Sequence, residues 1–144
     1  MAVTRRFLRG VTPAQVFAVL RDGRSYGHWV VGTRTIRDVD DGWPASGTRL
    51  HYTIGYAPLR HDNVTTAHVY DPESRLQLEA HAWPAGTAFI EIIATPTEGG
   101  TTVSIEEHPL RGLAKLLHNP VLDRLIKVRN VETLRRLEQQ ARRR

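Results

Sequence analysis

The chain contains no cysteine. This absence excludes disulfide bonds, thiolate nucleophiles and zinc sites built on cysteine. A domain of 144 residues buries roughly 70% of the surface that its unfolded chain exposes, so it can form a stable core without covalent cross-links. A small domain without disulfides is typical of a reducing compartment, and we expect a cytoplasmic protein.

Long hydrophobic runs are missing as well. No stretch of the sequence approaches the ~18 consecutive apolar residues that indicate a membrane-spanning helix. The first ten residues, MAVTRRFLRG, include basic residues but no apolar segment behind them, so we predict no secretory signal. No internal repeat or low-complexity segment occurs, and the length favours one domain over residues 1–144.

The net charge of +5 is distributed unevenly along the chain. Residues 111–144 hold ten of the 20 basic residues and three of the 15 acidic ones, which leaves residues 1–110 close to neutral. The basic pI therefore reflects the C-terminal segment and does not indicate a basic surface over the whole protein.

The basic C-terminal segment has two interpretations. A nucleic-acid module would use its arginines to bind phosphates. Residues 109–144 contain no Phe, Tyr or Trp, however, and so lack the aromatic side chains that stack on single strands. Glu132 precedes Arg135 and Arg136 by three and four residues, the spacing of ion pairs on a helix surface. We therefore predict a solvated helix face and no nucleic-acid partner.

One strand and two helical segments are predicted before residue 33. Residues 3–8 favour a short strand. The segment TPAQVFAVLRD, residues 12–22, begins with a Thr N-cap followed by Pro at the first helical position. A further helical turn over residues 24–29 places Tyr26 and Trp29, three residues apart, on one side.

The helical period disappears between residues 33 and 107. Turn residues rich in Gly, Pro and Asp divide this segment, and short connections make consecutive strands antiparallel. The expected strands cover residues 33–39, 48–56, 61–70, 75–83, 86–96 and 101–107. Apolar and polar residues alternate in several of them, which is typical of a sheet with one dry face. The strand at 61–70 shows no clear alternation.

Helical periodicity returns after HNP at residues 118–120, while residues 110–117 form either a separate helical turn or a loop. Apolar residues recur at every third position from Leu122 to Leu137. This spacing slips about 60° per step in a helix of 3.6 residues per turn, so the apolar stripe winds around the helix. We expect the first half to cover the dry sheet face. The second half would contact the first helix or a second subunit, which makes a homodimer through the C-terminal helix a candidate assembly.

The order of elements resembles the α+β helix-grip fold. The segment VFAVLRDGRSYGHWVVGTRTI is similar to the first-helix segment of the START-like (SRPBCC) superfamily, in which Tyr-x-x-Trp follows the helix. The segments WPASGTRLHY, VYDPESRLQL and GGTTVSIEE are similar to its Gly-Thr, Asp-Pro-x-x-Arg-Leu and Gly-Gly-Thr-x-Val turns. These motifs cover residues 1 to about 140 and resemble the polyketide cyclase/dehydrase and lipid-transport proteins. The resemblance implies a sheet curled around the long helix with a cavity for an apolar ligand.

Four residues are candidate ligand contacts: Trp29, Tyr52, Tyr56 and Glu107. In the family the Trp at the position of Trp29 packs at the mouth between helix and sheet, so packing is our first expectation and ligand contact the second. Tyr52 and Tyr56 share the phase of the dry face, where a hydroxyl needs a partner. Glu107 continues the apolar phase of its strand, where apolar walls would raise its pKa and let it bind a hydroxyl or act as acid or base. The alternative is that the strand frays and leaves Glu107 in water.

The sequence gives little support for a metal site or for a serine nucleophile. The seven histidines form none of the HxH, HxxxH or HExxH spacings, and no serine lies in GxSxG. We expect no metal and no cofactor, and Trp43, in the loop at 40–47, is a candidate for part of a lid. We predict a domain that binds a small hydrophobic or amphipathic ligand between sheet and C-terminal helix. The alternatives are a polyketide cyclase or dehydratase using the same cavity, and a ribosome- or RNA-associated START-like module.

Overall fold

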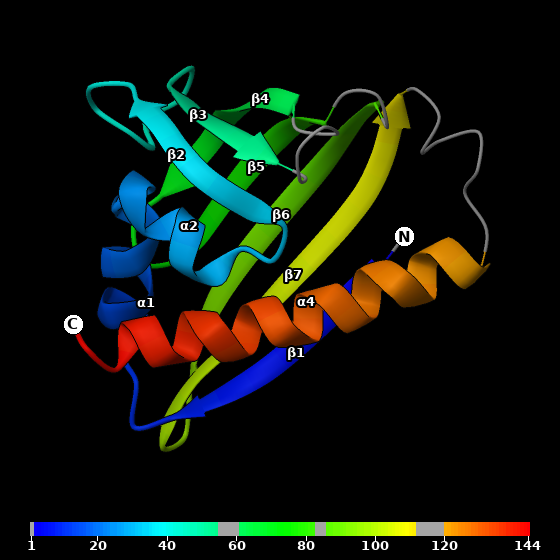
Figure 1. The fold of residues 1–144 in the computed structure, drawn as a ribbon. Helices are drawn as coiled ribbons and strands as arrows, with labels where there is room; N and C mark the ends of the chain where they lie inside the picture. The colour runs from blue at the N-terminus through cyan, green and yellow to red at the C-terminus, as the bar shows by residue number, and fades with distance from the viewer. Residues whose placement is uncertain (1, 55–60, 83–85, 112–119) are drawn as a thin grey trace.

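One antiparallel sheet organises the protein in a computed structural model that describes residues 2–54, 61–82, 86–111 and 120–144 (Figure 1). Its seven strands are β1 (Ala2–Arg9), β2 (Thr33–Val39), β3 (Arg49–Ile54), β4 (His61–Asp71), β5 (Arg75–Ala82), β6 (Gly86–Thr97) and β7 (Gly100–Arg111). They lie in the order β1-β7-β6-β5-β4-β3-β2. β2 to β7 thus form the meander that the short connections predicted, and β1 is the edge strand beside β7.

Among the described residues, the α-helices α1 (Pro13–Arg21), α2 (Tyr26–Trp29) and the long α4 (Pro120–Ala141) lie on one side of this sheet (Figure 1). The predicted N-cap of α1 is confirmed. The hydroxyl of Thr12 accepts from the backbone N–H of Gln15 at 3.2 Å, and the side-chain oxygen of Gln15 accepts from the N–H of Thr12 at 2.8 Å. This capping box satisfies two backbone donors at the start of the helix. Within the described part of the chain, no helix is long and apolar enough to cross a membrane.

Strand alternation correctly predicted the inner face of β3, β5 and β7. The apolar side chains that alternate along these strands are buried: Leu50 and Tyr52, Leu76 and Leu78, Val103 and Ile105. In β4 the inward residues are Asn63, Thr65 and Ala67, and the register shifts after Ala67. Small and polar inward residues and a bulge remove the apolar alternation, which explains why the sequence showed no phase there.

β7 is longer than predicted. It runs through Arg111, where the sequence indicated an end at residue 107. The long strand β6 provides the partner for this extension, because Ala88 pairs with Pro109 and Thr87 with Arg111. Residues 110–111 are therefore strand, and the rest of the segment at 110–117 lies outside the described residues.

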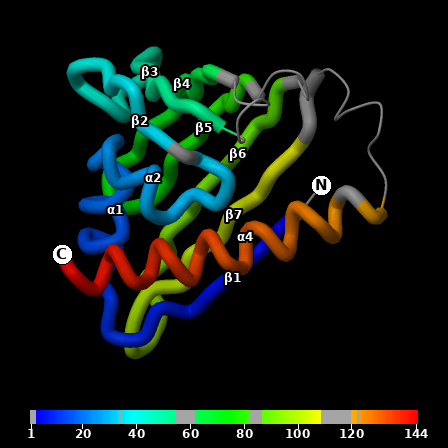
Figure 2. The backbone as a smooth tube through the Cα atoms, viewed as in Figure 1, coloured from blue at the N-terminus to red at the C-terminus, as the bar shows by residue number. Residues whose placement is uncertain are grey.

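The expectation for the first half of the C-terminal helix is wrong, whereas the expected contact of its second half with the first helix is confirmed. The second half of α4 is the buried half: Leu134, Leu137 and Ala141 form a stripe that packs in the core, where α4 contacts β1 and α1. The first half leaves Val121, Leu125 and Val128 largely exposed. Figure 2 shows the cause, since the C-terminal half of α4 lies beside α1 and α2 while its beginning extends away from both.

Candidate ligand-binding cavity

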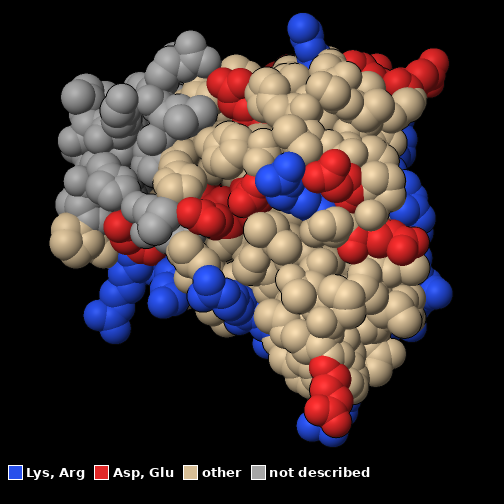
Figure 3. Space-filling view, turned by 180° about the vertical axis from the view of Figure 1, so that it is seen from behind, with Lys and Arg blue, Asp and Glu red and all other residues tan. Residues whose placement is uncertain are grey.

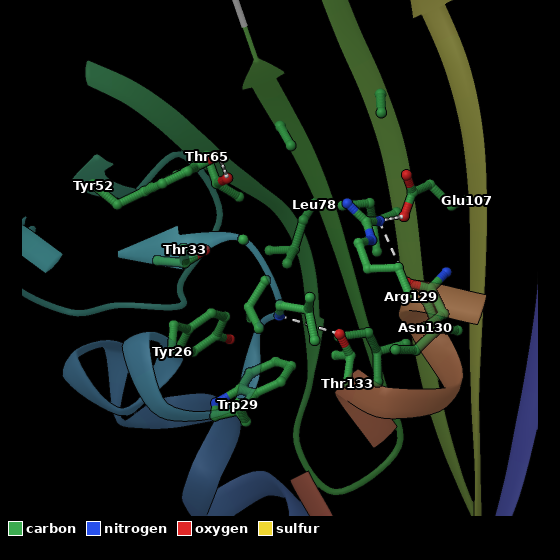
Figure 4. A pocket seen from close by; sticks show the side chains of 18 of the residues that line it. Tyr26, Trp29, Thr33, Tyr52, Thr65, Leu78, Glu107, Arg129, Asn130 and Thr133 are labelled. Carbon is green, nitrogen blue, oxygen red and sulfur yellow. Dashed lines mark hydrogen bonds and ion pairs between the residues drawn. The ribbon is translucent and has the colours of Figure 1, made fainter. Parts of the chain in front are cut away.

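A cavity of about 360 Å³ lies between the sheet, α2 and α4 (Figure 4). This volume is at the lower end of the range of roughly 300–1,000 Å³ that small-molecule sites occupy. The sheet contributes an apolar wall of Leu50, Ile54, Leu78, Ala80, Ala88, Ile90, Ile92 and Ile105. Polar side chains line it as well, among them Thr33, Tyr52, Thr65, Glu107, Arg129, Asn130 and Thr133. An apolar wall with a small number of polar groups is typical of a site that binds an apolar molecule and orients it.

Trp29 forms part of the wall beside α2. Its ring packs against Tyr26 with 4.5 Å between centroids, as the spacing of three predicted. The indole Nε1 donates to Ser25 Oγ at 3.1 Å, which satisfies the polar atom of this buried side chain. Trp29 is therefore a fixed packing residue and a lining residue at once, and its contact with a ligand stays a prediction.

Trp43 is not part of a lid. It is buried, its ring meets Tyr26 edge-on at 5.7 Å, and its Nε1 donates to the backbone oxygen of Leu20 at 3.1 Å. The hydroxyl of Tyr26 donates to the same oxygen at 2.9 Å, and burial raises the pKa of this hydroxyl far above its ordinary value. The last carbonyls of a helix lack intrahelical donors, and two buried aromatic groups use this one as their acceptor.

Tyr52 lies on the sheet wall, as its strand phase predicted. Its hydroxyl is 3.0 Å from Thr65 Oγ1, and burial raises the pKa of this hydroxyl above its usual value. Thr65 also lines the cavity but could not be identified from the sequence, because β4 shows no alternation. Tyr56, the other predicted Tyr, lies outside the described residues.

Glu107 reaches the cavity from β7. Its strand does not fray there, and only 8% of its side chain is exposed. Apolar side chains line the cavity with it, as its strand phase indicated, but the guanidinium of Arg129 also donates from Nη2 to the Glu107 carboxylate, a partner that the sequence did not predict. The same Nη2 also lies 3.3 Å from Asn130 Oδ1. A carboxylate, a guanidinium and an amide thus meet on one part of the wall (Figure 4).

Arg129, Asn130 and Thr133 are lining residues that the sequence reading missed. They lie on the face of α4 that continues the buried stripe of its second half, but they are polar, so an apolar periodicity does not include them. Thr133 Oγ1 accepts from the backbone N–H of Val31 at 3.2 Å, which ties α4 to the segment after α2. Counting helical spacings back from Leu134 and Leu137 would have identified this face.

The described residues offer no metal centre. Within them, His, Asp and Glu side chains form no group of three that could hold an ion. The pairing of β3 with β4 places His51 opposite Val64, and no histidine of β4 lies directly across from it. The ring of His51 lies 3.2 Å from Asp40, and that of His68 lies 2.8 Å from Glu79.

A curved antiparallel sheet that grips a long C-terminal helix around a cavity defines a helix-grip protein. The family model described as "Polyketide cyclase / dehydrase and lipid transport" matches residues 2–142. The chain therefore belongs to this family, as the motifs of the sequence indicated. A comparison with curated proteins finds no match.

Solved structures share this fold at low sequence identity. A Mesorhizobium loti protein is 18% identical with a TM-score of 0.70, and the match covers 99% of this chain and 96% of that one. Ara h 8.0201 is 13% identical with a TM-score of 0.74, over 99% and 97% of the two chains. The di-domain ARO/CYC StfQ from the steffimycin biosynthetic pathway is 12% identical with a TM-score of 0.69, over 99% of this chain and 51% of that chain. At these identities the likeness supports the fold alone.

Proposed function

We propose that this protein binds a small hydrophobic or amphipathic molecule in the cavity between its sheet and α4. The observation that carries the proposal is the cavity of about 360 Å³ with a predominantly apolar wall. An apolar ligand would gain roughly 25 cal/mol for each Å² of its surface removed from water. Membership in a family that includes lipid-transport proteins supports carriage of such a ligand.

Filling the cavity provides the direct test. Ala80 lines the cavity and pairs across the sheet with Ala88, so Ala80→Phe places a ring in the binding space. Native mass spectrometry of protein purified at low salt should show a bound mass of a few hundred daltons, absent from Ala80→Phe. Ala14→Phe, at an exposed position of α1, adds the same ring outside the cavity and should retain the ligand. Equal occupancy in both variants would place the ligand elsewhere, and protein that neither carries a ligand nor binds an added apolar probe would contradict the proposal.

The second candidate is a polyketide cyclase or dehydratase that uses the same cavity. It is favoured by the buried carboxylate of Glu107, which is paired with Arg129 at the cavity, and by the Tyr52 hydroxyl, since either can transfer a proton to or from a bound substrate. Glu107→Gln or Tyr52→Phe should then abolish turnover while binding persists. Retained turnover in both variants would contradict this candidate.

Self-association through α4 is a further proposal. Val121, Leu125 and Val128 present an exposed apolar stripe in its first half, and a second copy of the chain offers a matching stripe. Light scattering after gel filtration should give twice the mass of one chain, and Leu125→Asp should return the mass to that of a monomer. A monomer in the unaltered protein would exclude this assembly.

The basic segment supports an RNA-associated module less well. Arg135 and Arg136 both bind Glu132, and Arg142 pairs with Glu138, as expected for a solvated helix face. Acidic and basic side chains both occur on the face of the molecule opposite the view of Figure 1 (Figure 3). A nucleic-acid module requires a steep salt dependence of RNA binding that is lost on deleting residues 142–144. Binding without that dependence, or no binding, would contradict it.

A further inference from the structure

The polar part of the cavity wall can distinguish between ligand head groups. Glu107 comes from β7 and Arg129 from α4, and their side chains meet at the cavity while the sheet wall beside them is apolar (Figure 4). Among the described residues, both hydrogen bonds that Arg129 donates leave from Nη2, one to Glu107 and one to Asn130. The guanidinium has five N–H donors, and 40% of the Arg129 side chain is exposed. The guanidinium of Arg129 therefore retains N–H donors for a ligand in the cavity.

The two charges compensate each other. A carboxylate head placed against Arg129 would also approach the carboxylate of Glu107, and an ammonium head placed against Glu107 would approach Arg129. Like charges brought together in a poorly solvated site reduce affinity. A carboxylate head that displaced Glu107 from Arg129 would also leave the Glu107 carboxylate buried without its counter-charge. An uncharged oxygen avoids both penalties, because a carbonyl accepts from the guanidinium and a hydroxyl can also donate to the carboxylate.

We propose that the Glu107–Arg129 pair selects ligands whose head is an uncharged hydroxyl or carbonyl over carboxylates with the same apolar body. The inference rests on the proposed function, because it assigns a head-group class to the ligand of the same cavity. A second polar point, the hydroxyl pair of Tyr52 and Thr65, lies on the sheet wall and provides a further partner for an oxygen of the ligand.

Three probes with one apolar body test the proposal: naphthalene, 2-naphthol and 2-naphthoate. At pH 7 the naphthol is uncharged and the naphthoate is ionised, and each is titrated into the full chain by isothermal calorimetry. The unaltered protein should bind 2-naphthol about tenfold or more tighter than 2-naphthoate. Glu107→Gln removes the repelling carboxylate and frees Arg129, so naphthoate affinity should rise about tenfold or more. Glu132→Gln, which also removes a carboxylate bound to arginines on α4 but lies outside the cavity lining, should leave both affinities unchanged.

The outcomes separate this inference from the proposed function. Naphthalene binding with an equal or higher affinity for naphthoate than for naphthol, or no gain of naphthoate affinity in Glu107→Gln, would overturn the head-group selection and leave the proposed function standing. Failure of all three probes to bind the folded protein would overturn both. Where Glu107→Gln does not fold by circular dichroism, the double variant Glu107→Gln with Arg129→Gln leaves no unpaired charge. Its naphthol-to-naphthalene affinity ratio should fall about tenfold, and an unchanged ratio would overturn the inference.

Discussion

Two leucines on α4 provide a matched test of how this helix grips the sheet. Leu137 is 0% exposed and belongs to the core, whereas Leu125, three turns earlier, is 63% exposed. Changing each to Ala removes the same atoms from the same helix and gains the same small increment of helix propensity. The difference in unfolding free energy between Leu137→Ala and Leu125→Ala therefore reports burial alone.

The expected magnitudes differ several-fold. Truncating a fully buried Leu costs about 2–5 kcal/mol, because transfer energy is lost and a cavity remains. An exposed truncation stays within about 0.5 kcal/mol. We expect Leu137→Ala to be about 3 kcal/mol less stable than Leu125→Ala. At about 2–4 °C per kcal/mol for a domain near this size, the two melting temperatures should differ by roughly 6–12 °C.

Urea unfolding followed by far-ultraviolet circular dichroism measures the difference. The protein is kept dilute, so that self-association through α4 makes no contribution, and equal m-values show that the two variants expose the same surface on unfolding. Equal losses at the two positions, or a larger loss at Leu125, would refute the reasoning. Either result would mean that the first half of α4 is covered and that its second half does not hold the sheet.

Three further predictions concern stability. Tyr26→Phe should cost about 1 kcal/mol in urea unfolding, since Trp43 still donates to the shared carbonyl at the end of α1, and a loss above about 3 kcal/mol would contradict this sharing. Gly100→Ala should cost about 3 kcal/mol and lower the melting temperature, because a Cβ there would overlap a backbone oxygen of β1, and a neutral result would contradict this pairing. Burial alone would raise the pKa of Glu138, but hydrogen bonds from two arginines lower it below its ordinary value of 4.5. Its stabilising contribution is therefore present above pH 4.5 and lost as the pH falls below it, so Glu138→Gln should destabilise the protein at pH 7 and less at pH 3, and equal losses at both would contradict the shift.

The order and type of the elements could be predicted because each carries its own local signal. Thr12 and Pro13 mark the start of α1, and the spacing of Tyr26 and Trp29 predicts their ring contact. Alternation in β3, β5 and β7 identified the inward side chains, because successive residues of a strand point to opposite faces. The signal failed in β4, where inward positions hold Asn63 and Thr65.

The candidate site was predicted only in part. Tyr52 and Glu107 could be found because each continues the phase of its own strand. Arg129 could not, because a basic residue in a basic segment is typical of a solvated face, and its partner lies 22 positions away in the chain. Trp43 was misplaced for a similar reason, since nothing in its loop indicates that the end of α1 supplies an acceptor.

The periodicities of the chain therefore establish one antiparallel sheet, its dry face and a long C-terminal helix, while the motifs indicate the family. A periodicity depends only on the spacing of residues that are close in the chain. The regular geometry of a helix or strand then places residues of one period on the same face of that element. The periodicities do not establish which face of α4 meets the sheet, because a stripe that winds around the helix is compatible with several orientations. The curvature of the sheet and the packing of α4 on β1 and α1 select one of them. That selection buries Leu137, exposes Leu125 and brings Arg129 to Glu107, because contacts between distant segments form only when the whole core is assembled.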